Sequence, residues 1–363
     1  MSNKIKVFFV IPTLFAGGAE RVMSFVSQNL DKEKFDVTLV VIGFEKDSRY
    51  AISGITVRYL NKDRVLHSVF TLAKIFRKQK PQIVISAISH LNVVMGFMSV
   101  FFPKIKFIGR HTIVRIQDKE FKAKYKKNTF KKRIKQPLGK GYKLLDIILC
   151  QSMDMFVDMR DESHIPEHKL RIINNPITDN FDIKLRDSNN GEITKLITVA
   201  RISKNKGHKR ILNALSKVDF PYQYTIIGKG VEKDNVFDQI KKLGIEGRIK
   251  YIPFTTEVPK HLASSDFYLM GSYSEGLPNS LIESCSVGTP VLAYRAPGGL
   301  NEVIEPGING YLVDSEEEFI EKLNESVKKE WSPEIIRNSV YKKFNKKKII
   351  SDYEHLFFDV LNK

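Results

Sequence analysis

The chain has 363 residues, of which 42% are hydrophobic, and its formal net charge is +18. This length and composition predict a globular protein with enough residues for two domains. The charge indicates a polyanionic partner, such as nucleic acid, an anionic membrane surface or a substrate that bears phosphate. The two cysteines, Cys150 and Cys285, lie in apolar runs and form no CxxC pair, which argues against a zinc or redox site. Buried free thiols fit a reducing cytoplasm.

The first apolar run could be mistaken for a targeting sequence. "KIKVFFVIPTLFAGGA" has a basic start, an apolar centre and small residues, as a signal peptide does. Pro12 interrupts the run, however, and a buried first strand followed by a glycine turn explains the same residues. The other long apolar stretch, residues 91–102, has only 12 residues and is too short to cross a bilayer. We therefore expect no membrane-spanning segment.

The first half of the chain alternates short apolar runs with helical patterns. Between most of the runs the apolar residues recur at helical spacing, as they do in residues 19–30. Short apolar runs separated by helices are typical of a parallel sheet that helices cover on both faces. The expected strands of this half are residues 5–13, 35–43, 82–88, 106–111 and 144–152.

The pattern breaks at residues 171–180 and at the polar stretch 185–195, which we interpret as a linker, and then starts again. We expect a first α/β domain at residues 1–180, a second at 181–345, and a helix at 346–363 that packs back on the first domain. Ligands of doubly wound sheets bind at the carboxyl ends of the strands, so we expect the active site in a cleft between two facing domains. The expected strands of the second half are residues 195–201, 222–230, 248–254, 266–272 and 290–296.

Two cations follow the first strand of the second half. Arg201 ends the run "KLITVAR", and Lys206 lies five residues later, before Gly207 and a helical stretch. Two cations in a tight loop beside a helix N-terminus can neutralise a diphosphate. A solvated basic loop explains these residues equally well, because the chain has many lysines.

The stretch "YSEGLPNSLIESCSVGTPVLAY", residues 273–294, contains two carboxylates around one expected helix. Pro278 suits the first turn of that helix and Gly288 its end. Glu283 shares a helix face with Asn279, and Glu275 precedes the helix, where backbone N–H groups are unpaired. We expect Glu275 to be exposed in a cleft. Amides bind phosphate and carboxylates accept hydrogen bonds from sugar hydroxyls, so a nucleotide sugar would suit this pocket. A capped helix with chance acidic residues also fits the spacing.

"EGLPNSLIES" resembles the paired-glutamate signature of retaining glycosyltransferase family 4, whose members have the GT-B fold. Further motifs resemble this family in the same order along the chain. Ala200 stands where the family often has glycine, which is a mild departure. The further motifs are "GGAERV" at 17–22, "IINNPI" at 172–177, "VARISKNKG" at 199–207, "IIGKG" at 226–230 and "GGLNEVIEPGINGYLV" at 298–313.

The resemblance implies a donor site in the second domain. Glu283 would bind the ribose hydroxyls and Glu275 the hexose, while Arg201 and Lys206 would hold the diphosphate and stabilise it as the leaving group. The turn between the two glutamates would bind the donor through its backbone; its residues are Gly276, Leu277, Pro278 and Asn279. The donor would be a nucleotide diphosphate sugar, with UDP favoured.

The resemblance also implies roles in the first domain. Gly17 and Gly18 would let the first loop approach the phosphates closely, and His111 matches the position of an active-site histidine in many members. A partly buried structural histidine is the alternative. No Asp-x-Asp motif is present, in keeping with the family's metal-independent chemistry, and no cofactor is expected. The implied reaction is transfer of a hexose or N-acetylhexosamine to a hydroxyl with anomeric retention, by front-face attack.

The segment 119–143 contains 11 Lys or Arg residues and one acid, Glu120, interleaved with Phe121, Tyr125 and Phe130. Such a segment can lie on an anionic membrane surface or grip the pyrophosphate of a polyprenyl-linked acceptor. It resembles a basic helix of family members that extend lipid-linked or capsular oligosaccharides. We therefore expect a glycan or polyprenyl-diphosphate-linked acceptor and a cytoplasmic enzyme on the inner face of the membrane. A solvated lysine-rich helix is the alternative.

Two other protein classes would each explain part of the sequence. A nucleic-acid-binding protein would explain the charge, but the sequence has no RNP, helix-turn-helix or zinc-finger pattern, so no nucleic-acid partner is expected. A nicotinamide-dependent dehydrogenase would need G-x-G-x-x-G, which neither glycine-rich loop completes. The sequence leaves open the hexose, the acceptor and the linkage formed.

Overall fold

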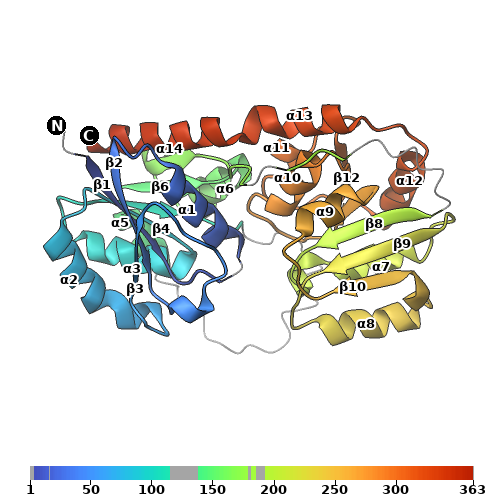
Figure 1. Cartoon of the computed structure of the whole chain (residues 1–363), viewed down its shortest axis with the longest axis horizontal. Coiled ribbons are helices and arrows are strands. Elements are labelled where there is room, and N and C mark those ends of the chain that lie inside the picture. The colour runs from blue at the N-terminus through green and yellow to red at the C-terminus, as the bar shows by residue number, and fades with distance from the viewer. Residues whose placement is uncertain (1–3, 16, 115–137, 179–180, 185–192, 363) are drawn as a thin grey trace. The chain divides into compact units, whose positions relative to one another are not determined.

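The computed structural model describes residues 4–15, 17–114, 138–178, 181–184 and 193–362 (Figure 1). The described residues form two compact units. Unit 1 comprises those within 1–113, 128–178 and 346–363, and unit 2 comprises those within 114–127 and 179–345. Most of the basic segment predicted to bind membranes, residues 119–137, lies outside the described residues. No described helix has both the length and the apolar character to span a bilayer.

Unit 1 is built on a seven-stranded sheet in which every pairing is parallel. The strand order is β3-β2-β1-β4-β5-β6-β7, so the chain starts in the middle and winds outward in both directions. β1 is buried along Val7 to Ile11, as expected for a central strand covered on both faces. The strands are β1 (Ile5–Ile11), β2 (Phe35–Val41), β3 (Thr56–Tyr59), β4 (Ile83–Ala87), β5 (Lys106–Arg110), β6 (Ile147–Cys150) and β7 (Leu170–Ile172).

The sequence pattern missed the two edge strands of this sheet. β3 alternates exposed and half-buried residues over only four positions, so it has no apolar run to recognise. β7 takes the first residues of the stretch that we interpreted as linker. The helices of unit 1 are α1 (Gly18–Asn29), α2 (Val69–Gln79), α3 (Ser89–Ser99), α5 (Leu138–Leu144), α6 (Met153–Val157) and α14 (Lys346–Leu361).

The C-terminal helix α14 belongs to the core of unit 1. Ile349, Tyr353 and Phe357 repeat every four residues and are buried in the same cluster as the residues of β1 and β2. The Phe357 ring lies 6.3 Å from that of Phe9 and 5.9 Å from that of Phe35, in edge-to-face contact. The last helix of the chain thus completes the core that the first strands begin.

Unit 2 repeats the architecture with a six-stranded, all-parallel sheet of order β10-β9-β8-β11-β12-β13. The predicted pair of Rossmann-like α/β domains is therefore confirmed. The strands are β8 (Thr194–Val199), β9 (Tyr222–Ile227), β10 (Ile249–Ile252), β11 (Phe267–Met270), β12 (Val291–Tyr294) and β13 (Gly310–Val313). The helices are α7 (His208–Leu215), α8 (Lys233–Lys242), α9 (Val258–Ala263), α10 (Asn279–Ser286), α11 (Leu300–Val303), α12 (Glu316–Ser326) and α13 (Pro333–Phe344).

The order of strands in unit 2 determines which loops meet. β8 and β11 are direct neighbours although 67 residues separate the end of one from the start of the other. Because the strands are parallel, the loop after β8 (200–207) and the loop after β11 (271–278) leave the same edge of the sheet. These two loops contain Arg201, Lys206, Glu275 and the turn that precedes α10.

Candidate functional site

The loops after β8 and β11 are bound to each other through Asn205. The Tyr273 N–H donates to the Asn205 backbone carbonyl oxygen at 2.8 Å, and the Asn205 side-chain amide donates back to the Ser274 carbonyl oxygen at 2.8 Å. This reciprocal pair holds Lys206, next to Asn205, beside Glu275, next to Ser274. The sheet brings the loops to one edge, and these bonds fix how they face each other.

Two glycines allow the loops to approach this closely. Gly207 has φ of +59°, a left-handed conformation that side chains disfavour. A Cβ atom at Gly207 would lie only 1.7 Å from the Gly271 carbonyl oxygen, and one at Gly271 would lie 2.5 Å from the Gly207 oxygen. Glycine is therefore required at both positions by the contact between the loops.

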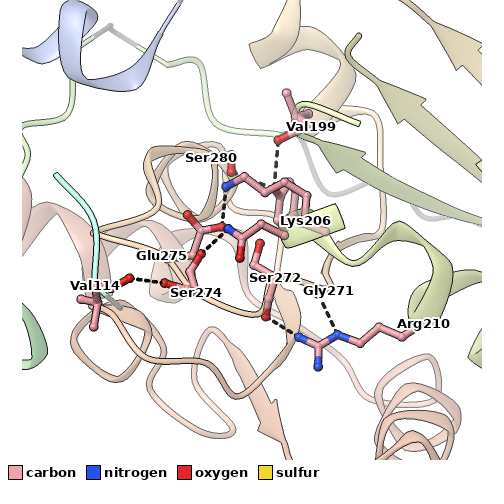
Figure 2. Close-up of polar contacts among 11 residues, drawn as sticks. Val114, Val199, Lys206, Arg210, Gly271, Ser272, Ser274, Glu275 and Ser280 are labelled. Atoms are coloured by element: carbon pink, nitrogen blue, oxygen red, sulfur yellow. Dashed lines mark hydrogen bonds and ion pairs between the residues drawn. The ribbon is translucent and has the colours of Figure 1, made fainter. Parts of the chain in front are cut away.

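Arg210 supports the loop after β11 from the side of α7. Its guanidinium donates to the carbonyl oxygens of Gly271, at 2.7 Å, and Ser272 (Figure 2). The same group lies between two aromatic rings, 4.1 Å from the centroid of Tyr273 and 4.1 Å from that of Tyr294. Sequence reasoning assigned Arg210 no role, because its partners lie more than 60 positions away along the chain.

We expect Arg210→Ala to lower the stability of unit 2 by about 2–4 kcal/mol, because two charge-assisted hydrogen bonds and two cation–π contacts are lost. Urea unfolding followed by fluorescence measures this, since Trp331, the only tryptophan, belongs to unit 2. Arg248→Ala is the matched control, because Arg248 lies over one ring, that of Tyr222, at 5.1 Å. Equal effects of the two substitutions would show that Arg210 does not support the loop.

Glu275 is paired with Lys206 inside this arrangement. The Lys206 ammonium nitrogen lies 2.5 Å from Glu275 Oε1, and Figure 2 shows the two side chains pointing toward each other. Only 8% of Glu275 is exposed, so our expectation that it is an exposed cleft residue was wrong. Lys206 covers its carboxylate. On the other side, the Ser274 hydroxyl donates to the Val114 carbonyl oxygen at 2.7 Å, and the backbone carbonyl oxygen of Glu275 accepts from the Val114 N–H at 3.4 Å.

The positive charge of this loop comes from lysine and arginine and not from the neighbouring histidine. His208 is buried at the start of α7, and burial lowers its pKa to about 4, helped by the charge of Lys206. At neutral pH His208 is therefore uncharged. Arg201 is exposed, and its guanidinium makes no hydrogen bond or ion pair with a described residue. The loop's third cation, Lys204, pairs with Glu232 at 3.8 Å. Arg201 and Lys206 are therefore the two loop cations that we assign to an anionic ligand.

Glu283 lies on α10, close in sequence to a serine that contacts the buried Tyr268. Only 8% of Glu283 is exposed. The buried Tyr268 hydroxyl lies 2.7 Å from Ser280 Oγ, also on α10. Burial raises the pKa of Tyr268, and the negative charges of Glu275 and Glu283 raise it further. Both predicted glutamates thus act electrostatically on the same phenol of unit 2.

The turn from Gly276 to Asn279 connects these two glutamates. α10 begins at Asn279, so Pro278 precedes the first turn instead of lying in it as we predicted, a shift of one residue. A second loop lies against the turn: the Glu275 N–H donates to the Pro297 carbonyl oxygen at 2.9 Å, and the Gly299 N–H donates to the Gly276 oxygen at 2.6 Å. Sequence reasoning quoted residues 298–299 as part of a motif but gave them no role.

The remaining predicted residues belong to unit 1. Gly17 precedes α1 and Gly18 begins it, and the Tyr50 hydroxyl donates to the Gly17 carbonyl oxygen at 3.1 Å. His111 follows β5 directly and is buried, with 8% exposed. The predicted site residues are thus divided between the units. The two glutamates, the two cations and the turn 276–279 belong to unit 2, while Gly17, Gly18 and His111 belong to unit 1.

A chain of hydrogen bonds orients the His111 ring. The Asn92 side chain accepts from Ser86 and donates to the Tyr142 hydroxyl at 3.0 Å. The Tyr142 hydroxyl lies 3.1 Å from His111 Nδ1. The tautomer of the His111 ring decides which of these two groups donates to the other. In either case the contact fixes the orientation of the ring.

Metal and thiol chemistry find little support among the described residues. These residues contain no cluster of three or more His, Cys, Asp or Glu side chains that could hold a metal ion. Cys150 and Cys285 are both free and buried, as predicted. Burial raises the pKa of Cys150 to about 12, so its thiol is protonated and unreactive at neutral pH.

Both halves of the chain match families of glycosyltransferases. Residues 16–181 match Glycosyltransferase Family 4, and residues 181–344 match Glycosyl transferases group 1. An uncharacterised glycosyltransferase from Haemophilus influenzae is 26% identical over 328 residues, which cover 87% of this chain and 88% of that protein. The N-acetylgalactosamine-N,N'-diacetylbacillosaminyl-diphospho-undecaprenol 4-alpha-N-acetylgalactosaminyltransferase of Campylobacter jejuni is 28% identical over 202 residues, which cover 53% of this chain and 54% of that protein.

Among solved structures, Anabaena HepE in complex with UDP superposes with a TM-score of 0.77 at 18% identity, over 98% of this chain and 100% of that one. This similarity shows that the fold is shared. The two family matches together extend from residue 16 to residue 344 and meet at residue 181, close to the start of the longer segment of unit 2. The chain belongs to glycosyltransferase family 4 and has the GT-B fold, as the paired glutamates and the order of the other motifs predicted.

Proposed function

We propose that this glycosyltransferase moves a hexose or N-acetylhexosamine from a nucleotide diphosphate sugar to a hydroxyl of a membrane-associated glycan acceptor, with retention of anomeric configuration. The observation that carries the proposal is the site in unit 2. It combines two cations of one loop, a lysine–glutamate pair and a second buried glutamate, all at the carboxyl edge of a parallel sheet. A nucleotide diphosphate sugar has the complementary groups, namely a diphosphate, a ribose and a hexose.

The charges of the site suggest where each group of the donor would bind. Its diphosphate would bind Arg201 and Lys206, and its sugar hydroxyls would donate to Glu275 and Glu283. A diphosphate beside Lys206 would share that ammonium with Glu275, since the two side chains are already in contact at 2.5 Å. The Lys206–Glu275 pair would therefore sit between the diphosphate and the hexose, where the bond to be broken lies.

In the reaction, the bond between the anomeric carbon and the diphosphate oxygen breaks, and a bond from the acceptor oxygen forms on the same face of the sugar. The acceptor proton passes to the departing diphosphate, whose growing charge Arg201 and Lys206 stabilise. His111, on unit 1, is proposed to donate a hydrogen bond to the substrates. The two cations would serve where other transferases use a divalent ion, and no cofactor is required.

Two relatives suggest the first substrates to test. HepE was solved with UDP, and the Campylobacter transferase is named for an undecaprenyl-diphosphate-linked substrate. We propose a UDP-sugar as donor and a glycan carried on a polyprenyl diphosphate as acceptor, in surface polysaccharide or oligosaccharide synthesis. The net charge of +18 favours an anionic membrane surface as a further partner, with the enzyme peripheral on the inner face of the membrane.

Removing either cation should weaken nucleotide binding. We expect Arg201→Ala and Lys206→Ala each to raise the Kd for UDP about 10- to 150-fold, the range for losing a hydrogen bond to a charged group. Isothermal titration calorimetry measures this directly. Lys229→Ala, in the loop after the neighbouring strand β9, removes a lysine that has no proposed role and is the control. Unchanged affinity in both site variants would remove the loop from the donor site.

A chelator tests whether the leaving group is stabilised by the two basic side chains or by a bound metal ion. Sugar transfer should persist in EDTA because Arg201 and Lys206 neutralise the leaving group. Loss of turnover in EDTA, restored by magnesium or manganese, would show that the two cations are insufficient.

A panel of ligands tests the class of protein. We expect UDP or GDP to raise the thermal unfolding midpoint, while NAD and a DNA oligomer leave it unchanged, because only a nucleoside diphosphate fills the proposed site. Stabilisation by DNA alone would favour the nucleic-acid-binding alternative, and stabilisation by NAD alone would favour a dehydrogenase.

A further inference from the structure

Two helices of unit 1, α2 and α3, are apolar on more faces than the core requires. Their inward faces are buried through Leu72 and Phe76 on α2 and through Leu91 and Met95 on α3. The α3 sequence, residues 89–99, nevertheless contains no Lys, Arg, Asp or Glu at all. A helix at the surface of a water-soluble domain normally has a charged outer face.

Large apolar side chains in these helices and beside them are exposed. Phe70 on α2 and Leu66, in the 3-10 turn Val65–Ser68 directly before it, have 89% and 71% of their surfaces exposed. Phe97 on α3 and Phe101, two residues after its end, are 43% and 76% exposed. Together with Val69, Ala73, Val94, Met98 and Phe102, these side chains line a groove of about 860 Å³ between α2 and α3. Figure 1 shows the two helices on the same side of unit 1.

The charged residues that line the groove are all cations. Lys74, Arg77 and Lys78 lie on α2 along one rim, and the lining contains no Asp or Glu. The Arg77 guanidinium lies 6.0 Å from the centroid of the Phe102 ring. Long basic side chains that lie along apolar surface keep their charged ends in water or among anionic groups. The groove is thus an apolar surface with a positive edge.

We propose that this α2–α3 groove is where unit 1 enters an anionic lipid bilayer. Phe70, Phe101 and Leu66 insert into the boundary between headgroups and acyl chains, and Lys74, Arg77 and Lys78 bind the lipid phosphates above them. The complementarity of charge favours a bilayer over a second copy of this chain, because a copy has the same excess of positive charge. The inference rests on the membrane-associated acceptor of the proposed function and names the surface that brings the enzyme to it.

The test uses the full chain and sedimentation with lipid vesicles. The wild type should pellet with vesicles of phosphatidylcholine containing 30% phosphatidylglycerol at low salt, and weakly with phosphatidylcholine alone. The double variant Phe70→Ser, Phe101→Ser should reduce partitioning at least about 10-fold, because two exposed rings no longer insert. Phe254→Ser is the matched control, since Phe254 is 59% exposed but belongs to unit 2, and it should pellet like the wild type.

A second variant separates charge from apolar insertion. Lys74→Gln, Lys78→Gln should lose the preference for anionic vesicles while retaining the weak binding to neutral ones. Release of UDP from a UDP-sugar should continue in both double variants, because the proposed donor site lies in unit 2. Wild-type protein that ignores anionic vesicles, or a Phe70→Ser, Phe101→Ser protein that pellets fully, would overturn the docking surface alone. A dimer that this variant converts to monomer would assign the groove to a second copy and would also overturn it.

Discussion

Glu275→Gln is expected to lower kcat for sugar transfer about 10²–10³-fold, the scale for losing one polar contact that strengthens in the transition state. Glutamine keeps the shape and one hydrogen-bond acceptor for Lys206 but removes the negative charge. Glu275→Ala would lower kcat at least as much, but it would also leave the half-buried Lys206 ammonium without its partner. The isosteric variant therefore isolates the contribution of the carboxylate to the reaction.

The measurement is the rate of UDP release at saturating donor and acceptor. Glu316→Gln is the control, because Glu316 pairs with Lys217 at the same 2.5 Å in the same unit and has no proposed role in binding substrate. We expect the control to retain wild-type turnover and both variants to unfold at similar urea concentrations, followed by Trp331. Wild-type turnover in Glu275→Gln would remove this carboxylate from the active site.

Gly207→Ala is expected to lower the free energy of unfolding of unit 2 and also to weaken UDP binding. The left-handed backbone alone costs about 1–2 kcal/mol for a residue with a side chain. The added Cβ would also meet the Gly271 carbonyl oxygen at 1.7 Å, which forces the loops apart and adds about 1–3 kcal/mol of overpacking. A shift of ~1 Å between Lys206 and Glu275 is enough to lower the rate about 10²-fold.

Gly244→Ala provides a closely matched comparison. Gly244 has φ of +66°, close to that of Gly207, but a Cβ there would have no described neighbour within 4 Å. Urea unfolding should show the backbone cost in both variants and the additional cost only in Gly207→Ala, together with weakened UDP binding. Equal stability and equal UDP affinity of the two variants would mean that the contact between Gly207 and Gly271 is not important.

The sequence predicted the sheets well where strands are buried on both faces. Runs such as residues 5–11 and 267–270 are apolar throughout because helices cover both sides of a parallel strand. The edge strand β3 was missed because helices do not cover both of its sides. Its exposed and half-buried residues alternate, so it contains no apolar run. The paired glutamates and the Arg201–Lys206 loop were recognisable because their spacing within a single loop or helix is fixed.

The contacts within the site were not predictable from that spacing. Lys206 and Glu275 are 69 positions apart, and only the pairing of β8 with β11 brings their loops to one edge. The burial of Glu275 follows from that pairing, which is why a single-sequence argument expected an exposed residue. Arg210 gave no signal because its two tyrosines come from the loop after β11 and from the end of β12. The groove between α2 and α3 was also missed, since an apolar stretch in the sequence does not reveal which of its faces is covered.

The most direct test of the donor site is to incubate the enzyme with UDP- and GDP-sugars and to follow the products by NMR. We predict that at least one α-linked nucleotide sugar is consumed, without added acceptor by slow hydrolysis, and that the α anomer of the free sugar appears first. Glu275→Gln should suppress the same signal. If no nucleotide sugar is consumed, or if the β anomer appears first from an α-linked donor, the proposed retaining transfer at this site is contradicted.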